Sequence, residues 1–241
     1  MILLIDAGNS RIKWRLQCAS KGRVEAEGAL VHDDIDRLAS LRPQALSAAR
    51  IVGSNVAGTA VAERIARALG GEHIDWLRPG QQACGVRNLY EHPLQLGADR
   101  WAALIGARAV HAYASVVVMA GTATTVDLLS ASGDFLGGLI LPGVELMQQS
   151  LARGTAQLPS ASGKFRLQPR CTLDAIRSGC LQAQAGAVER MFRQIATQPD
   201  ALCLLSGGAA DGFAELLDIP LQRIDNLVLH GLAVFAASHP Q

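Results

Sequence analysis

The sequence predicts a mixed α/β fold made of two similar lobes that face a central cleft. A strand-turn-strand-turn-strand pattern opens the chain and returns about half a chain later. Amphipathic helical segments follow each group of strands, as expected for a duplicated domain that packs helices on each sheet. We therefore place an N-terminal lobe at residues 1–114 and a C-terminal lobe at residues 115–241, with ligands bound where the lobes meet.

The elements of the first lobe follow from apolar runs and turn residues. Turns at Ala7-Gly8-Asn9 and Lys21-Gly22 separate short apolar runs of strand length. Longer segments with apolar residues at helical spacing follow them. In order, the predicted elements are strands at 2–5, 11–16, 24–30 and 46–52 and helices at 57–69 and 99–113.

The second lobe repeats this arrangement. Turns at Ala120-Gly121 and Ser132-Gly133 separate the strands, and a long helical segment carries its apolar residues on roughly one stripe. That stripe consists of Leu173, Ile176, Val188, Met191 and Ile195. The predicted elements are strands at 116–119, 122–129, 135–141 and 202–205 and helices at 144–151, 173–195, 209–217 and 227–237.

Composition narrows the class of function. The chain has 241 residues and a formal net charge of +1, so it lacks the broad positive field that nucleic acid or anionic membranes usually require. Its five cysteines form no C-x-x-C pair and fit reduced thiols better than a disulfide framework. Asp6 interrupts the apolar start, and no run of 18 apolar residues follows. We expect a cytoplasmic protein with a small-molecule partner, bound to neither nucleic acid nor membrane.

The segment Asp6-Ala7-Gly8-Asn9-Ser10-Arg11-Ile12-Lys13 places a carboxylate at the end of an apolar strand and a Gly-Asn turn directly after it. A turn at Gly8 lets backbone N–H groups approach phosphate oxygens, while Asn9 and Ser10 add donors and Lys13 adds charge. Asp6 is a candidate ligand for Mg²⁺, which prefers oxygen donors. An ordinary hairpin with a capping aspartate has the same residues, so this segment alone leaves both interpretations open.

Two segments of the second lobe add candidate nucleotide contacts. Gly121 and Thr122 occupy the corresponding turn of the repeat and offer donors to the β and γ phosphates. Gly207 and Gly208 follow a predicted strand and allow a base or ribose to lie against the backbone. Threonine is also common in strands and paired glycines in tight turns, so a structural role stays open for both. Two repeated turns that face each other would form a nucleotide clamp.

The segment from Asn88 to Arg100 leads into a predicted helix. A carboxylate in a first helical turn is stabilised by the helix dipole, so Asp99 is a candidate anionic base for a substrate hydroxyl. Arg100 is a candidate for binding an anionic substrate group. A simple N-cap is the alternative role of Asp99.

No G-x-x-x-x-G-K-[ST], G-x-G-x-x-G or H-E-x-x-H motif is present, which disfavours P-loop kinases, dinucleotide-binding enzymes and zinc proteases.

Taken in this order, the motifs resemble those of the type III pantothenate kinases, members of the actin-like ATPase, sugar kinase and Hsp70 superfamily. The resemblance spans nearly the whole chain and includes a later segment, Thr172-Leu173-Asp174-Ala175-Ile176-Arg177-Ser178-Gly179. It implies two actin-like, ribonuclease H-like domains, a homodimer, and phosphorylation of pantothenate by ATP with Mg²⁺, the first step of coenzyme A synthesis.

The resemblance also implies roles for individual residues. ATP contacts fall on Asp6, Gly8, Asn9, Ser10, Lys13, Gly121, Thr122, Gly207 and Gly208, the general base on Asp99, and pantothenate contacts on Tyr90, Gly97, Ala98, Asp99, Arg100 and Thr172. Thr172 corresponds to a threonine that reaches the site of the neighbouring subunit. Met119 stands where the family usually has an aspartate that helps bind potassium or ammonium. A thioether is a poor ligand for a hard cation, so other oxygens bind this ion or the chain dispenses with it.

Two alternatives stay open on the residues alone. One is a regulatory protein that binds nucleotide without catalysis, to which Met119 lends slight support. The other is a kinase for another small hydroxyl compound, or a phosphohydrolase, because pattern does not define the shape of a pocket.

Overall fold

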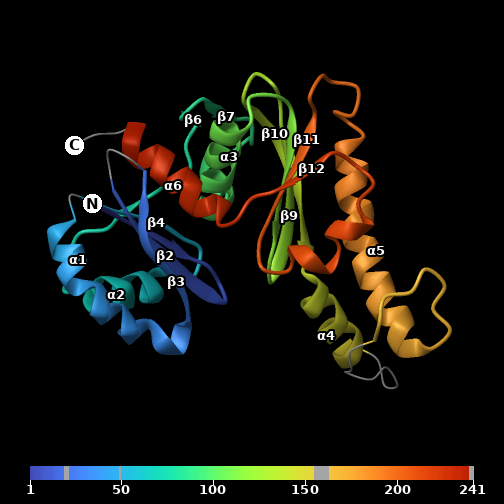
Figure 1. Cartoon of the computed structure of the whole chain (residues 1–241), viewed down its shortest axis with the longest axis horizontal. Coiled ribbons are helices and arrows are strands. Elements are labelled where there is room, and N and C mark those ends of the chain that lie inside the picture. Colours follow the sequence, from blue (N-terminus) through green and yellow to red (C-terminus); the bar gives the residue numbers. More distant parts are fainter. Residues whose placement is uncertain (19–21, 49, 155–162, 239–241) are drawn as a thin grey trace. The chain divides into compact units, whose positions relative to one another are not determined.

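The structure is a computed structural model that describes residues 1–18, 22–48, 50–154 and 163–238 (Figure 1). The chain divides into two compact units, one formed by residues 1–110 with 226–241 and the other by residues 111–225. The described strands form a five-stranded and a seven-stranded sheet, and each unit has its own hydrophobic core.

The sheet of the first unit has the strand order β3-β2-β1-β4-β5. Strand β1 pairs antiparallel with β2 and parallel with β4, which places the ends of β1 and β4 side by side. The turn between β1 and β2 lies at the same edge of the sheet. The strands are β1 (Ile2–Ala7), β2 (Arg11–Gln17), β3 (Val24–Val31), β4 (Arg50–Asn55) and β5 (Asp75–Trp76).

Helices of the first unit cover this sheet because each has one apolar side. Ile35, Leu38, Ile65 and Leu69 are buried against strand residues such as Leu3. The remaining elements are η1 (His32–Leu41), α1 (Arg42–Ser47), α2 (Thr59–Ala68), β6 (Gln82–Ala83), β7 (Val86–Asn88), η2 (Pro93–Gln95), α3 (Ala98–Val110) and α6 (Leu227–Ser238).

Helices α3 and α6 lie side by side in the first unit (Figure 1). Their backbones meet at two glycines: a Cβ on Gly231 would lie 1.7 Å from the Ala102 oxygen, and one on Gly106 would lie 2.7 Å from the Leu227 oxygen. Most residues of α6 are apolar, and Leu227, Val228, Leu229, Leu232 and Ala236 are buried. Helix α6 therefore belongs to the first compact unit, although the sequence analysis assigned it to the lobe at 115–241. The lobe boundary at residue 114 stays a prediction.

The second unit repeats the topology of the first. Five strands of the seven-stranded sheet lie in the order β10-β9-β8-β11-β12, with β8 antiparallel to β9 and parallel to β11, which matches β3-β2-β1-β4-β5. The predicted duplication of an α/β domain is therefore confirmed. The elements are β8 (Ser115–Ala120), β9 (Ala123–Leu129), β10 (Asp134–Pro142), α4 (Val144–Gly154), α5 (Thr172–Phe192), β11 (Leu202–Ser206), η3 (Ala210–Gly212), η4 (Ala214–Leu216) and β12 (Leu221–Arg223).

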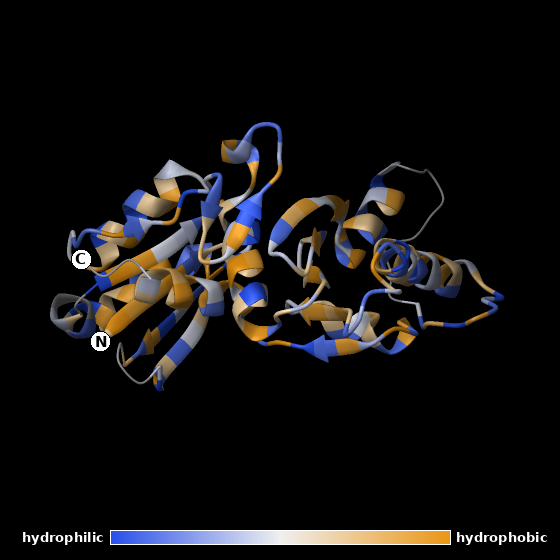
Figure 2. Cartoon of the chain, turned by 90° about the horizontal axis from the view of Figure 1, so that it is seen from above, coloured by the Kyte–Doolittle hydropathy of each residue, from blue (hydrophilic) through white to orange (hydrophobic). Residues whose placement is uncertain are grey.

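The core of the second unit lies between its sheet and α5. Ile176, Val188, Met191 and Ile195 of the predicted stripe are buried, and Leu173 is partly buried at the start of the helix. The exposed residues of α5 are small or polar, among them Ala175, Gly179, Gln182 and Arg190. Figure 2 shows hydrophobic and hydrophilic residues interspersed along the strands and helices. The five cysteines are all free thiols. In the described part of the chain, every helix is too short or too polar to cross a bilayer.

Several predicted boundaries were wrong. The strand expected at 46–52 begins only at Arg50, because helix α1 ends at Ser47; residue 49 lies outside the described residues. The helix expected at 209–217 is instead two 3₁₀ turns, separated near Gly212. Strands β5, β6, β7 and β12 have two or three residues each and were not predicted, because so few residues show no periodicity.

Candidate active site

Asp6 lies near the end of β1, between the neighbouring strands β2 and β4. Its Cα partner on β2 is Lys13 and its partner on β4 is Ser54. The Ser54 hydroxyl is fully buried and donates a hydrogen bond of 2.8 Å to Asp6 Oδ1. Sequence reasoning found Asp6 and Lys13 but missed Ser54, because the pairing of β1 with β4 is a tertiary contact.

Burial raises the pKa of Asp6 from 3.8 to about 6. The hydrogen bond from Ser54 opposes this shift, the negative charge of Asp99 adds to it, and the positive charge of Lys13 opposes it. The two carboxylates therefore interact electrostatically.

Asp6→Asn is expected to stabilise the ligand-free protein at neutral pH. A folded-state pKa above the unfolded value means that the native state binds more protons, so stability falls as pH rises from about 4 through about 6. Asparagine keeps an acceptor for Ser54 and carries no charge. The free energy of unfolding should therefore rise by roughly 2 kcal/mol above pH 6 and hardly change at pH 4.

Urea denaturation at pH 4 to 8, without nucleotide or divalent ions, measures this difference. Asp36→Asn is the control, since Asp36 is an exposed carboxylate of η1. An increase in the free energy of unfolding of Asp6→Asn that is equal at all pH values would contradict the expectation.

Asp99 is the second residue of α3, and its Oδ1 accepts a hydrogen bond of 2.8 Å from the Arg100 backbone N–H. Burial raises the pKa of Asp99, and the hydrogen bond and positive charge of Arg100 oppose this rise. The sequence analysis expected the helix start to favour the ionised form of Asp99. The Arg100 N–H and guanidinium do favour it, but burial has the larger effect on the pKa. A carboxylate with a raised pKa is a stronger base, which suits proton abstraction from an alcohol.

Gly97 lies two residues before Asp99, where a side chain would crowd the Asp99 carboxylate. A Cβ on Gly97 would lie 2.5 Å from Asp99 Oδ1, inside any normal contact distance. The Gly97 carbonyl also accepts a hydrogen bond of 2.9 Å from the Trp101 backbone N–H and so starts the helix. Glycine at this position lets the carboxylate keep its orientation, and buried Ala98 packs the same turn.

Arg100 and Tyr90 form a pair beside Asp99. The Arg100 side chain is buried and donates from NH1 to the Tyr90 hydroxyl at 3.0 Å, with its guanidinium carbon 5.6 Å from the centre of the Tyr90 ring. Asn88 holds the intervening loop, because its side chain bonds the Tyr90 N–H and the Pro93 carbonyl. The structure thus brings the predicted residues Tyr90, Gly97, Ala98, Asp99 and Arg100 together in one unit with Asp6 and Lys13.

The two glycine turns of the repeat have similar hydrogen bonding. The Gly8 N–H donates to the Arg11 carbonyl at 3.1 Å, and the Gly121 N–H donates to the Ala123 carbonyl at 3.0 Å. Neither glycine has a positive φ. Both turns therefore use their glycine N–H internally, and phosphate binding by other N–H groups of these turns stays a prediction. Asn9 and Ser10 lie exposed at the tip of the first turn.

In the second unit, the structure brings Gly121 and Thr122 next to Gly207 and Gly208. Strands β8 and β11 are parallel and end together, and the Ala209 N–H donates to the Ala120 carbonyl at 3.1 Å. Gly207 has φ of 107° and a Cβ there would lie 2.1 Å from the same Ala120 oxygen. The Gly143 N–H supports the turn by donating to the Thr122 carbonyl at 2.8 Å.

Gly207→Ala and Gly208→Ala should therefore behave differently. Alanine at Gly207 meets backbone at 2.1 Å and needs an unfavourable φ, so we expect a loss of roughly 3 kcal/mol in unfolding free energy. Nothing lies within 4 Å of a Cβ on Gly208, and this exposed residue has no positive φ. Gly208→Ala should keep the stability and affect only nucleotide binding, measured by denaturation and calorimetric titration with ATP. Equal stability of the two variants would disprove the packing argument.

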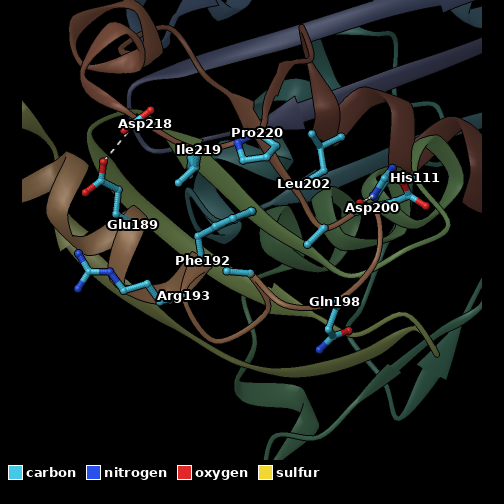
Figure 3. A pocket seen from close by; sticks show the side chains of 12 residues that line it. His111, Glu189, Phe192, Arg193, Gln198, Asp200, Leu202, Asp218, Ile219 and Pro220 are labelled. Carbon is cyan, nitrogen blue, oxygen red and sulfur yellow. Dashed lines mark hydrogen bonds between the residues drawn. The ribbon is translucent and has the colours of Figure 1, made fainter.

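A cavity of about 900 Å³ also lies in the second unit, with Figure 3 showing its lining. It opens beside the start of β11 at Leu202, whereas Gly207 follows the end of that strand. Its lining includes Glu189, Phe192 and Asp218 and none of the predicted site residues. The cavity is therefore separate from the candidate active site.

The comparisons with known proteins agree with these motifs. A sequence profile described as type III pantothenate kinase matches residues 2–194. A protein of Aromatoleum aromaticum named type III pantothenate kinase is 58% identical over 239 residues, which cover 98% of each chain. The chain belongs to the type III pantothenate kinase family.

Solved structures of low sequence identity share the fold of this chain. A Campylobacter jejuni protein described as a Baf family transcriptional activator aligns with a TM-score of 0.64 and 20% identity over 98% of each chain. A Sinorhizobium meliloti protein described as a 2-dehydro-3-deoxygalactonokinase aligns with a TM-score of 0.58 and 15% identity over 99% of each chain. At these identities the similarity concerns the fold alone.

Met119 and Thr172, which the sequence analysis matched to positions of the kinase family, lie in the second unit. Met119 is half-buried near the end of β8, where its Cα partners are Thr125 and Ser206. Thr172 is the exposed first residue of α5, so a ligand or a second subunit can reach it. Among the residues that the structure describes, no three His, Cys, Asp or Glu side chains group to hold a metal ion.

Proposed function

We propose that this protein phosphorylates the primary hydroxyl of pantothenate with ATP, the first step of coenzyme A synthesis. Membership in the type III pantothenate kinase family supports this activity, with relatives matched over nearly their whole length. The structural observation that carries it is the placement of Asp99 at a helix start, beside Asp6 and next to the Arg100–Tyr90 pair.

In the proposed mechanism, Asp99 accepts the proton of the pantothenate hydroxyl as the hydroxyl oxygen attacks the γ-phosphorus. The bond from that phosphorus to the β–γ bridging oxygen breaks, and ADP leaves. Burial raises the basicity of this carboxylate, and Gly97 leaves it free of steric contact. Arg100 is pre-oriented by Tyr90 and pairs with the pantothenate carboxylate. Such a reaction depends mainly on positioning and on electrostatic stabilisation of the transferred group.

In this proposal the nucleotide contacts the residues that the glycine turns present. Asn9, Ser10 and Lys13 contact its phosphates, as do Thr122 and the turn at Gly121. Gly208 leaves open space in which the adenosine lies against the backbone. Mg²⁺ fits Asp6, whose carboxylate has Ser54 on one oxygen and Asp99 as a charged neighbour, and the ion would neutralise phosphate charge.

The proposal includes the assembly of the protein and its use of a monovalent cation. The protein works as a homodimer in which Thr172 of one subunit contributes to the pantothenate site of the other. The potassium or ammonium ion used by the family has no carboxylate ligand at Met119, so we expect weak dependence on these ions.

A coupled assay for pantothenate-dependent ADP release tests the function, with mass spectrometry to identify 4′-phosphopantothenate. Parallel reactions in sodium, potassium and ammonium salts test the role of Met119. Turnover with pantothenate that changes less than about threefold between the cations is the expected result. ATP binding without turnover would instead indicate a nucleotide-binding regulatory protein.

A further inference from the structure

His32 contacts the turn that precedes β2, although it is 24 residues away in the sequence. Its Nε2 lies 2.8 Å from the Gly8 carbonyl oxygen. A carbonyl oxygen only accepts hydrogen bonds, so the imidazole donates through Nε2. The side chain is half-buried, which favours a lasting contact over one that water would replace.

The sheet explains how His32 reaches this turn. In the antiparallel pair of β2 and β3, Val31 lies opposite Arg11, the first residue of β2. The residue after β3 therefore arrives beside the turn that joins β1 to β2. His32 is that residue and begins the 3₁₀ segment η1, whose Ile35 and Leu38 are buried in the core. The imidazole is thus attached to a well-packed element.

The contact determines the direction of one backbone donor. The peptide between Gly8 and Asn9 is planar and trans, so its C=O and N–H groups point in opposite directions. The imidazole fixes the C=O, and the Asn9 N–H therefore points away from His32 at an exposed position. This N–H has no acceptor among the residues that the structure describes, whereas the Gly8 N–H is already bonded to Arg11.

We propose that His32 is a positioning residue that orients the Gly8–Asn9 peptide so that the Asn9 N–H binds a phosphate oxygen of the nucleotide. This inference rests on the proposed function, because it assigns the phosphates to the first turn. His32 itself does not touch the nucleotide. It limits the rotation of a peptide that would otherwise have to be ordered when ATP binds.

His32→Ala is expected to raise the Kd for ATP and its KM by about tenfold, with kcat and the KM for pantothenate nearly unchanged. His32→Gln keeps an N–H donor and should restore most of the affinity. His111→Ala is the matched control, because His111 Nε2 also lies 2.9 Å from a backbone carbonyl, that of Asp200, in the second unit. Calorimetric titration with ATP and Mg²⁺ gives Kd, and steady-state kinetics gives the KM and kcat values.

Lys13→Met separates a failure of this inference from a failure of the proposed function. If Lys13→Met weakens ATP binding and His32→Ala does not, the role of His32 is overturned and the phosphate site stands. If neither variant weakens binding, the phosphates bind elsewhere and both proposals are wrong. Equal defects in His32→Ala and His32→Gln would also overturn the inference, because the donor would then be irrelevant.

Discussion

Asp99→Asn is expected to lower kcat by about 10²- to 10⁴-fold, the usual contribution of a general base. Asparagine has nearly the same shape and can still accept the hydrogen bond from the Arg100 N–H, but it cannot take up a proton. ATP affinity should be kept or slightly increased, because the negative charge of Asp99 raises the pKa of Asp6 and its removal favours ionised Asp6. Phosphate transfer measured in single turnovers, together with calorimetric titration of ATP, tests both expectations.

The control for Asp99 is Glu91→Gln, which removes an exposed carboxylate from the same loop. We expect this variant to keep its kcat within about twofold, since surface substitutions away from a site have small effects. Asp99→Asn with unchanged turnover would remove Asp99 from the mechanism. A large loss of ATP affinity would instead assign it to nucleotide binding.

Gly231→Ala is expected to reduce the free energy of unfolding by about 3 kcal/mol, at the upper end of overpacking effects. Its new Cβ would lie 1.7 Å from the Ala102 oxygen, and that oxygen belongs to helix backbone, which cannot rotate away as a side chain does. Helices α3 and α6 would have to separate. Since α3 also carries Asp99 near its start, we expect kcat to fall as well.

Gly186→Ala in α5 is the matched control for the helix contact. It is also a helical glycine, but it is exposed and nothing lies within 4 Å of its Cβ position. Alanine should stabilise this helix by about 0.5–1 kcal/mol because of its higher helix propensity. Urea denaturation of both variants measures whether each substitution lowers or raises the free energy of unfolding. A stabilising effect of Gly231→Ala would show that the helices do not approach so closely.

The sequence predicted most of the longer strands and helices from their periodicity, but it missed the ten-residue 3₁₀ segment η1 and the helix α1 that follows it. The first three strands and their repeat after residue 115 were correct, and so were α2, α4 and α5 to within a few residues. The stretch at 209–217 was wrong because helix propensity could not reveal that it divides into two short turns around Gly212. The short strands were missed because their pairing, and not their composition, defines them.

The candidate site was predicted in part. Asp6, Lys13 and Asp99 belong to sequence motifs that can be recognised, and the structure places them in one unit. Ser54 and His32 belong to no such motif. A serine near the end of a strand and a histidine after a strand are too common to indicate a site. Only the pairing of β1 with β4 and of β2 with β3 brings them to Asp6 and Gly8.

The sequence by itself determined the class of fold and the family, because duplicated strand patterns and motif order are local features of the chain. The tertiary structure alone decided which charges interact and how strongly. The raised pKa of Asp99 is the clearest case: its place at a helix start favours the ionised form, but burial by residues distant in sequence outweighs it. Desolvation depends on everything packed around a group, and no local pattern contains that information.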